Sequence, residues 1–242
     1  MSRLYIKAKN SGGRTVISEC DFTSPLKIAK PFYSDDCTEI MMMTASAGML
    51  EGDNYDIGID VGENASLKFT GQSYTKLFKS DKTGSAQIVC INVESGGQLF
   101  YFPRPVIPFA ESVYSSETEI HLDAGSRFAM CDIISCGRTA MNERFLFKEY
   151  RSRTSVYVDG QLVFLDNLRL APSEINLSGI GFFENYSHMG MMYTYGHGEP
   201  FIPKSAGIET AISKANEGFC IRAAADSADT VYKLFSELLN SK

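Results

Sequence analysis

Charged and polar residues that flank strand-like stretches are the first candidates for chemistry in this 242-residue chain. Asp53 follows a glycine-bracketed loop, Gln72 and Lys76 end a later strand, and Arg138 and Glu143 flank one turn. Charged groups inside a β stack need partners, so spacing alone favours an ion pair between one of these cations and one of these carboxylates. The functional alternative is a polar lining of a cavity or passage, in which Asp53 and Glu143 contact a divalent cation transiently.

The three histidines offer a weaker indication of a metal site. His188 is followed by methionines at 189, 191 and 192, and imidazole with thioether sulfur suits copper(I). Methionines in a β core more often fill gaps, so we expect these to be core residues. His121 lies within a predicted strand, and His197 lies between two glycines, where a solvated histidine is expected.

Known catalytic and nucleotide-binding signatures are missing from the sequence. It has no Walker pattern, no complete dinucleotide loop, no Gly-x-Ser-x-Gly elbow and no His-Glu-x-x-His pair. The six cysteines are scattered without a Cys-x-x-Cys pair, which predicts reduced core residues rather than a zinc site. The residues alone therefore supply no established catalytic signature.

Composition argues against nucleic acid and membrane as binding partners. The net charge is −6 with acidic and basic residues interspersed, which argues against nucleic-acid binding. No run of about 18 apolar residues is present, so we expect no membrane span. The first residues lack the apolar core of a signal peptide, and we expect a cytoplasmic protein.

The elements that must position Asp53 and Lys76 can be predicted from periodicity. Gly48 and Gly52 bracket a loop, as expected for a sharp backbone reversal. Residues 55–61 alternate apolar and polar side chains, and a turn and a second apolar segment follow, which predicts a hairpin. That hairpin would bring Asp53 and the polar tip at 72–76 to the same end of a sheet.

A faint internal repeat extends this pattern. Ala65, Gly97 and Ser126 recur at roughly thirty-residue spacing, each between a turn and a large apolar residue. Such a period is typical of stacked hairpins rather than helices. It predicts an elongated two-layer or helix-like β stack.

The remaining elements agree with a mainly β fold. Strands separated by Asn10–Gly13 and by Asp159-Gly160 predict hairpins, and 208–216 predicts a short helix. Apolar residues from Val231 to Leu239 have helical spacing, with Asp226 or Ser227 as N-cap. Packing of this closing helix on its own sheet is the first expectation, and presentation of a face to a partner is the alternative.

We therefore predict a β-helix-like stack of hairpins in two layers, with a short helical section and an amphipathic C-terminal helix. The whole chain, 1–242, is expected to form one domain. Its β stack would span about 1–200, and its helical and closing segment about 201–242.

Five motifs, in this order, resemble those of the UreD family of urease accessory proteins, called UreH in some species. They are Ser24-Pro25-Leu26-Lys27 with Pro31-Phe32, Gly48 to Asp53, Thr70 to Lys76, Pro103 to Ser112, and Gly137-Arg138 with Glu143-Arg144-Phe145. A weaker similarity occurs at Ile221-Arg222. The site residues that this resemblance implies, as family motif and possible cavity lining, are Gly48, Gly52, Asp53, Gln72, Lys76, Pro108, Phe109, Gly137, Arg138 and Glu143.

Two residues depart from the family pattern. Met49 stands where many members have a second glycine, and Arg104 stands where many have an aspartate between two prolines. The first departure affects the backbone of the glycine loop. The second removes a possible carboxylate.

The resemblance implies a non-enzymatic maturation factor, a scaffold or chaperone that binds the urease apoprotein. It would recruit UreF and, through UreF, the GTPase UreG, for nickel insertion into a urease active site with a carbamylated lysine. The family also implies a β-helix-like stack and a possible dimer of heteromeric complexes. No tightly bound cofactor is implied; Ni²⁺ would pass transiently, with Asp53 and Glu143 as candidate contacts.

An alternative remains open from the residues themselves. A small-molecule-binding or hydrolytic β protein would use a pocket near Asp53, Glu143 and His188. Such a pocket would hold two or more titratable groups with shifted pKa values.

Overall fold

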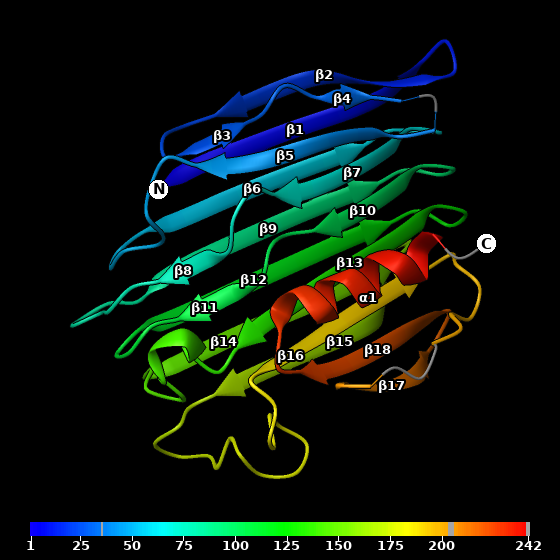
Figure 1. Ribbon diagram of the computed structural model, residues 1–242. Coiled ribbons are helices and arrows are strands. Elements are labelled where there is room, and N and C mark those ends of the chain that lie inside the picture. The colour runs from blue at the N-terminus through cyan, green and yellow to red at the C-terminus, as the bar shows by residue number, and fades with distance from the viewer. Residues whose placement is uncertain (35, 203–205, 241–242) are drawn as a thin grey trace.

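The computed structural model describes residues 1–34, 36–202 and 206–240, which form two stacked β-sheets and a helix (Figure 1). Sheet A contains β1 (Ser2–Ser11), β2 (Arg14–Phe22), β6 (Asn54–Val61), β9 (Ser85–Val93), β12 (Val113–Leu122), β14 (Glu149–Val158) and β15 (Gln161–Leu170). Sheet B contains β3 (Leu26–Ile28), β4 (Phe32–Tyr33), β5 (Thr38–Thr44), β7 (Ser66–Gly71), β8 (Thr75–Leu77), β10 (Gln98–Phe102), β11 (Val106–Pro108), β13 (Arg127–Ser135), β16 (His188–Tyr195), β17 (Ile208–Ala215) and β18 (Gly218–Ala225). A 3-10 turn, η1 (Thr139–Met141), and the helix α1 (Ala228–Asn240) complete the structure.

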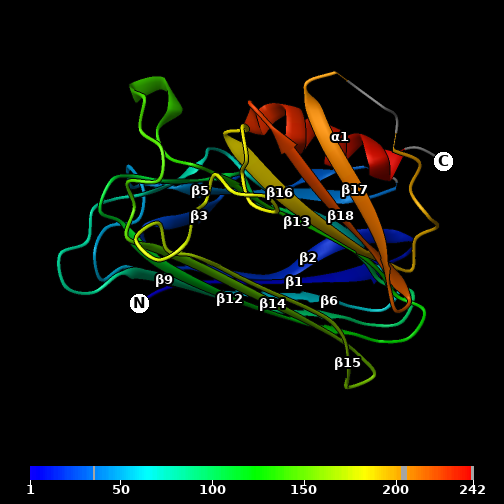
Figure 2. The ribbon, with the colours of Figure 1, turned by 90° about the horizontal axis from the view of Figure 1, so that it is seen from below.

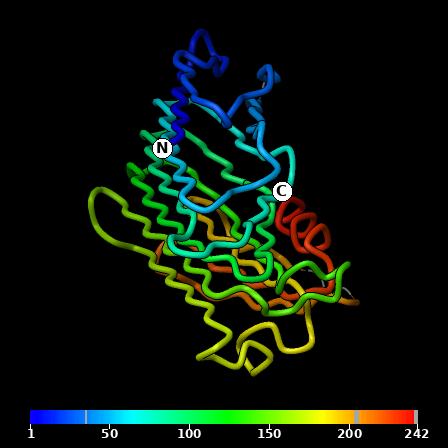
Figure 3. The backbone as a smooth tube through the Cα atoms, turned by 90° about the vertical axis from the view of Figure 1, so that its left-hand side faces the viewer, coloured from blue at the N-terminus to red at the C-terminus, as the bar shows by residue number. Residues whose placement is uncertain are grey.

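The centre of each sheet is parallel. In sheet A, β1, β6, β9, β12 and β14 run in one direction, with β2 and β15 antiparallel at the two edges. In sheet B, β5, β7, β10 and β13 are parallel. The chain crosses from one sheet to the other in each repeat, so its coils stack as in a β-solenoid (Figure 3). The predicted mainly β, helix-like stack is confirmed.

The faint sequence repeat marks the crossings between the sheets. The backbone N–H groups of Ala65, Gly97 and Ser126 each donate to the carbonyl three residues earlier, at 3.1, 2.8 and 3.1 Å. Neighbouring turns also bond to each other, for example from Arg127 N to Gly97 O at 2.9 Å. These tight turns form one end of the stack, which we call the turn end.

The predicted hairpin over residues 55–69 is wrong. Residues 54–61 form β6 in sheet A, whereas residues 66–71 form β7 in sheet B, so the turn between them is an arch from one layer to the other. Period-two alternation shows which side chains are buried. The same pattern fits two successive strands that pair in one sheet and two that lie in opposite sheets. The long return loops lie at the opposite end, which we call the loop end.

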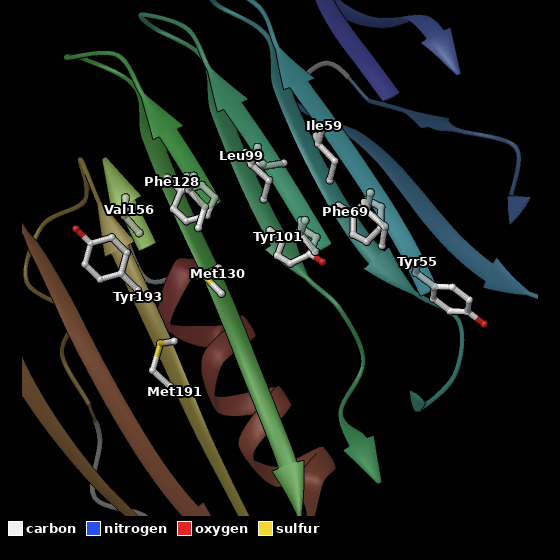
Figure 4. Close-up of a cluster of buried hydrophobic side chains, with 14 of the residues drawn as sticks. Tyr55, Ile59, Phe69, Leu99, Tyr101, Phe128, Met130, Val156, Met191 and Tyr193 are labelled. Atoms are coloured by element: carbon white, nitrogen blue, oxygen red, sulfur yellow. The ribbon is translucent and has the colours of Figure 1, made fainter. Parts of the chain in front are cut away.

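Two layers of apolar side chains hold the fold together. One lies between the sheets and includes Leu99 and Phe128, shown in Figure 4. The other lies between sheet B and α1, which covers that sheet from outside (Figure 2). Val231 and Phe235 of α1 are fully buried, and a Cβ at Gly190 would lie 2.8 Å from Val231, so this glycine lets the helix approach. The predicted closing helix and its packing on its own sheet are confirmed.

Of the other local predictions, two hairpins are confirmed and one helix is wrong. The hairpins at 10–13 and at Asp159-Gly160 are confirmed; both residues of the latter have positive φ, as a two-residue hairpin turn of this type requires. The predicted helix at 208–216 is wrong, because Ile208–Ala215 is strand β17, paired antiparallel with β18. Most of its residues are exposed, so backbone pairing rather than a buried stripe determines its conformation. Within the described ranges, the structure contains no helix whose length and apolar character would suit a bilayer crossing.

Candidate functional site

The residues of the family-like motifs gather at the loop end. The glycine loop before β6 lies against the segment after β7: Met49 N donates to Lys76 O at 2.8 Å, and Phe78 N donates to Met49 O at 2.9 Å. The expected meeting of the glycine loop with the 72–76 tip is thus confirmed, although an arch rather than a hairpin produces it. Gln72 is exposed and bonds through its backbone to Met42 O at 2.9 Å.

The glycine loop is shaped by close contacts. A Cβ at Gly48 would overlap the carbonyl oxygen of Lys76 and lie 2.8 Å from the ring of Phe78. Gly52 has φ +82°, a conformation that favours glycine. The Asp53 carboxylate accepts a 2.8 Å hydrogen bond from the backbone N–H of Leu50. Asp53 therefore closes its own loop.

Arg138 and Glu143 form one of the ion pairs that the sequence allowed. Arg138 Nε donates to Glu143 Oε2 at 2.7 Å, and Nη2 contacts the other carboxylate oxygen, so the pair is bidentate. The hydrogen bond from Arg138 lowers the pKa of Glu143. A Cβ at Gly137 would lie 2.7 Å from Glu143 O, which explains the glycine beside the pair. The guanidinium also lies 4.4 Å over the ring of Phe109.

These contacts form one continuous network across the loop end. The Phe78 ring lies 2.8 Å from the position that a Cβ on Gly48 would occupy, and its centroid lies 5.0 Å from that of the Phe109 ring. Pro108, just before Phe109, is buried in β11 and pairs with Leu77. The network therefore fixes four successive loops relative to one another, those that carry Gly48, Phe78, Phe109 and Arg138.

A cavity of about 210 Å³ lies between the two sheets and reaches the loop end, where Gly48 and Lys76 line it. Its walls carry several hydroxyls, including those of Tyr55, Thr118 and Ser152. The Tyr55 hydroxyl is buried and has no hydrogen-bond partner among the described residues. Asp53 and Glu143 are outside the lining of this cavity.

Sequence reasoning missed the one carboxylate in this lining, Asp132. On β13, Phe128, Met130 and Ile134 face the space between the sheets, and Asp132 shares their alternation. Ser152 Oγ of sheet A donates to Asp132 Oδ2 at 2.7 Å, with a longer 3.5 Å contact from Tyr150. Burial raises the pKa of Asp132, and the Ser152 bond opposes this shift. The available signal was a carboxylate on the apolar side of a strand.

Asp132 and its neighbouring hydroxyls are the part of this lining that suits weak binding of a hydrated cation, since the cationic residues Lys76 and Arg104 also line the cavity. A carboxylate with neighbouring hydroxyls offers the oxygen ligands that hard and borderline divalent ions accept. In the parts of the chain that the structure describes, no three His, Cys, Asp or Glu side chains cluster closely enough to hold a metal ion. The lining therefore offers contacts rather than a closed coordination sphere.

The residues of the alternative pocket do not meet around one cavity. His188 is buried on β16, and its Nδ1 lies 2.8 Å from Ser187 Oγ. Burial lowers the pKa of His188. Its strand neighbours Gly190 and Met192 face α1, so His188 belongs to the helix side of sheet B. Asp53 and Glu143 instead lie in two other loops, where they are engaged with Leu50 and Arg138.

Comparison of the sequence with known proteins shows its family. The family model described as UreD urease accessory protein matches residues 1–241. A urease accessory protein UreD from Acetivibrio thermocellus is 38% identical, covering 99% of this chain and 96% of the relative. Proteins named urease accessory protein UreH from Helicobacter hepaticus and from a Helicobacter pylori strain are each 31% identical, covering 98% and 96% of this chain and 96% and 91% of the relatives. The chain therefore belongs to the UreD family of urease accessory proteins.

Proposed function

We propose that this protein is a non-catalytic scaffold for urease maturation that conveys nickel toward the urease active site. It binds the urease apoprotein and recruits UreF and, through UreF, the GTPase UreG. Membership of the urease accessory protein family supports the role in maturation. We further propose a cytoplasmic location and assembly as a dimer of heteromeric complexes.

The observation that carries the nickel part of the proposal is Asp132 in the cavity between the sheets. A carboxylate on the apolar side of β13 loses hydration, as its raised pKa indicates, and among the described residues only Ser152 donates a short hydrogen bond to it. A divalent cation beside it would restore the favoured ionised form. Few ligands make the binding weak, and weak binding suits an ion that must be released.

The network at the loop end supports the scaffold part of the proposal. Arg138, Phe109 and Phe78 hold the return loops in one arrangement, so the surface they present needs little ordering on binding. Asp53 and Glu143 serve first to hold this surface. Their transient contact with nickel stays a prediction, which folded Asp53→Ala and Glu143→Ala variants with full urease activation would contradict.

Urease activation in cells at limiting nickel tests both parts. Deletion of this chain is expected to abolish urease activity, and full activity in the deletion strain would reject a maturation role. Asp132→Asn is expected to retain co-purification with UreF and urease but to lower the nickel content of urease. The control is Glu117→Gln, an exposed carboxylate paired with Arg153 on the outer face of sheet A. Normal nickel loading with Asp132→Asn would reject the route through the cavity.

Contact between α1 and UreF is a further prediction. Lys233 and Glu237 lie on the exposed side of α1, 77% and 62% exposed and 3.7 Å apart. Their replacement by alanine should leave the buried side of the helix in place. Reduced capture of UreF by this double variant would support the contact, and unchanged capture would dismiss it.

A further inference from the structure

Asp132 belongs to a row of side chains that leads from the cavity to the side of the molecule. In sheet B, Asp132 pairs with Met191 on β16, and Met191 pairs with Arg222 on β18. Residues at paired positions point to the same face of a sheet, so all three face sheet A. Met191 is 4% exposed and lies between the two charged residues.

An ion pair closes the gap between the sheets at the outer end of this row. Arg222 Nη2 lies 2.5 Å from Asp166 Oδ1. Asp166 lies on β15, the edge strand of sheet A, so the bond joins two different sheets. The side chain of Arg222 is 47% exposed and that of Asp166 is 17% exposed. The pair therefore stands between solvent and the space between the sheets.

A second, small cavity lies directly behind this pair. Its volume is about 10 Å³, and Asp132, Met191, Asp166 and Arg222 are among the residues that line it. That volume is close to the minimum that a single water molecule needs. Asp132 lines this cavity as well as the larger one, so one carboxylate separates the two spaces.

We propose that the Asp166–Arg222 ion pair is a lateral gate of the cavity between the sheets. With the pair closed, the Arg222 guanidinium binds the Asp166 carboxylate, and the positive charge of Arg222 repels a cation at the side opening. With the pair open, Asp166 and Asp132 present two carboxylates along one path, and a hydrated divalent cation passes between Asp132 and solvent. The gate itself is a property of the fold; only nickel as its cation rests on the proposed function.

Access to position 191 tests the gate directly. Met191→Cys in the full-length chain places a thiol behind the ion pair, and methyl methanethiosulfonate is a small neutral reagent for it. Peptide-resolved mass spectrometry separates this thiol from the six native cysteines. The gate is removed by Asp166→Asn with Arg222→Gln, which leaves no net charge to alter thiol reactivity. We expect modification of Cys at 191 to become at least about tenfold faster, since each factor of ten corresponds to about 1.4 kcal/mol of opening free energy.

Two further variants make the result specific. Charge reversal, Asp166→Arg with Arg222→Asp, restores an ion pair and should return the slow rate. Glu117→Gln with Arg153→Gln removes a 3.1 Å pair on the outer face of sheet A and should leave the rate unchanged. Leu168→Cys, which also lines the small cavity, is the second reporter if the first variant folds poorly.

An equal rate with and without the ion pair would overturn the gate. So would a charge-reversed protein that reacts as fast as the neutral one. The measurement needs neither urease nor nickel, so its failure leaves the maturation role untouched. Conversely, a gate that opens as expected in a protein whose Asp132→Asn variant loads urease normally would reject the nickel route alone.

Discussion

Asp132 on β13 accepts a 2.7 Å hydrogen bond from Ser152 on β14, across the space between the two sheets. The two strands belong to different layers of the stack, so this bond joins them through the core rather than along a sheet. Burial disfavours the ionised form of a carboxylate in that position and therefore raises the pKa of Asp132. The bond thus makes the core sensitive to protonation.

The first prediction concerns stability against pH. Because the pKa of Asp132 is higher in the folded than in the unfolded chain, its stabilising contribution is complete below the unfolded pKa and is lost as pH rises through the folded pKa. Asp132→Asn removes the charge and should stabilise the protein at neutral pH by roughly 1 kcal/mol. Urea unfolding of both proteins at pH 5 and pH 7.5 measures this difference.

The gain in unfolding free energy from Asp132→Asn should be smaller at pH 5 than at pH 7.5. Ser152→Ala gives the matched comparison, because it removes the opposing bond and leaves the carboxyl in place. It should increase the loss of stability on going to neutral pH. A constant difference between wild type and Asp132→Asn at both pH values would contradict the assignment.

How much could be predicted depends on whether an interaction is local. The turns at Ala65, Gly97 and Ser126 are set by short-range backbone bonds, so their repeat was visible in the sequence. The closing helix was equally visible, because its apolar stripe from Val231 is strong. The ion pair of Arg138 with Glu143 joins residues that flank one turn, so it was among the pairs that the sequence allowed.

The sequence does not reveal which of the two sheets a strand joins. The alternation in 55–69 is the same for a hairpin and for an arch, and only pairing with β9 and β10 separates them. Residues 208–215 lack a buried stripe, and their pairing with β18 is a tertiary contact. The role of Asp132 depends on the position of β14 opposite β13, which is a tertiary contact.

The second prediction concerns the glycine loop. Gly48→Ala would place a methyl group against the Lys76 carbonyl and the Phe78 ring, so the loop must shift. We expect destabilisation of about 2 kcal/mol, within the range for overpacking. Gly198→Ala is the control, because a Cβ there meets no atom within 4 Å. Equal urea midpoints for the two variants would contradict the close approach at Gly48.

The third prediction concerns the layer between sheet B and α1. Phe235 is fully buried against this sheet, and an atom of its ring lies 3.0 Å from the position that a Cβ on Gly190 would occupy. Phe235→Ala should destabilise the protein by about 3–5 kcal/mol through lost burial and an unfilled cavity. Exposed Lys233→Ala is the matched control on the same helix and should change stability little. Thermal unfolding measures both, and a loss under about 1 kcal/mol for Phe235→Ala would show that α1 contributes little to the fold.

The fourth prediction concerns Arg104, which stands where many family members have aspartate. Its guanidinium lies 4.6 Å over the ring of Tyr232 on α1, and its Nε donates to Gly71 O at 3.1 Å. It therefore ties the cavity lining to the helix, a role that aspartate is too short to fill. Arg104→Asp should cost about 1 kcal/mol, the scale of one hydrogen bond with a cation–π contact.

A double-mutant cycle with Tyr232→Leu isolates the stacking. Arg104→Asp should cost less in the Tyr232→Leu background than in the wild type, because the ring contact is already lost there. Arg104→Lys keeps the charge but not the planar fork, so it should lose the bond to Gly71 and retain part of the attraction to the ring. Strict additivity of the Arg104 and Tyr232 changes in urea unfolding would mean that the stacked geometry contributes nothing to stability.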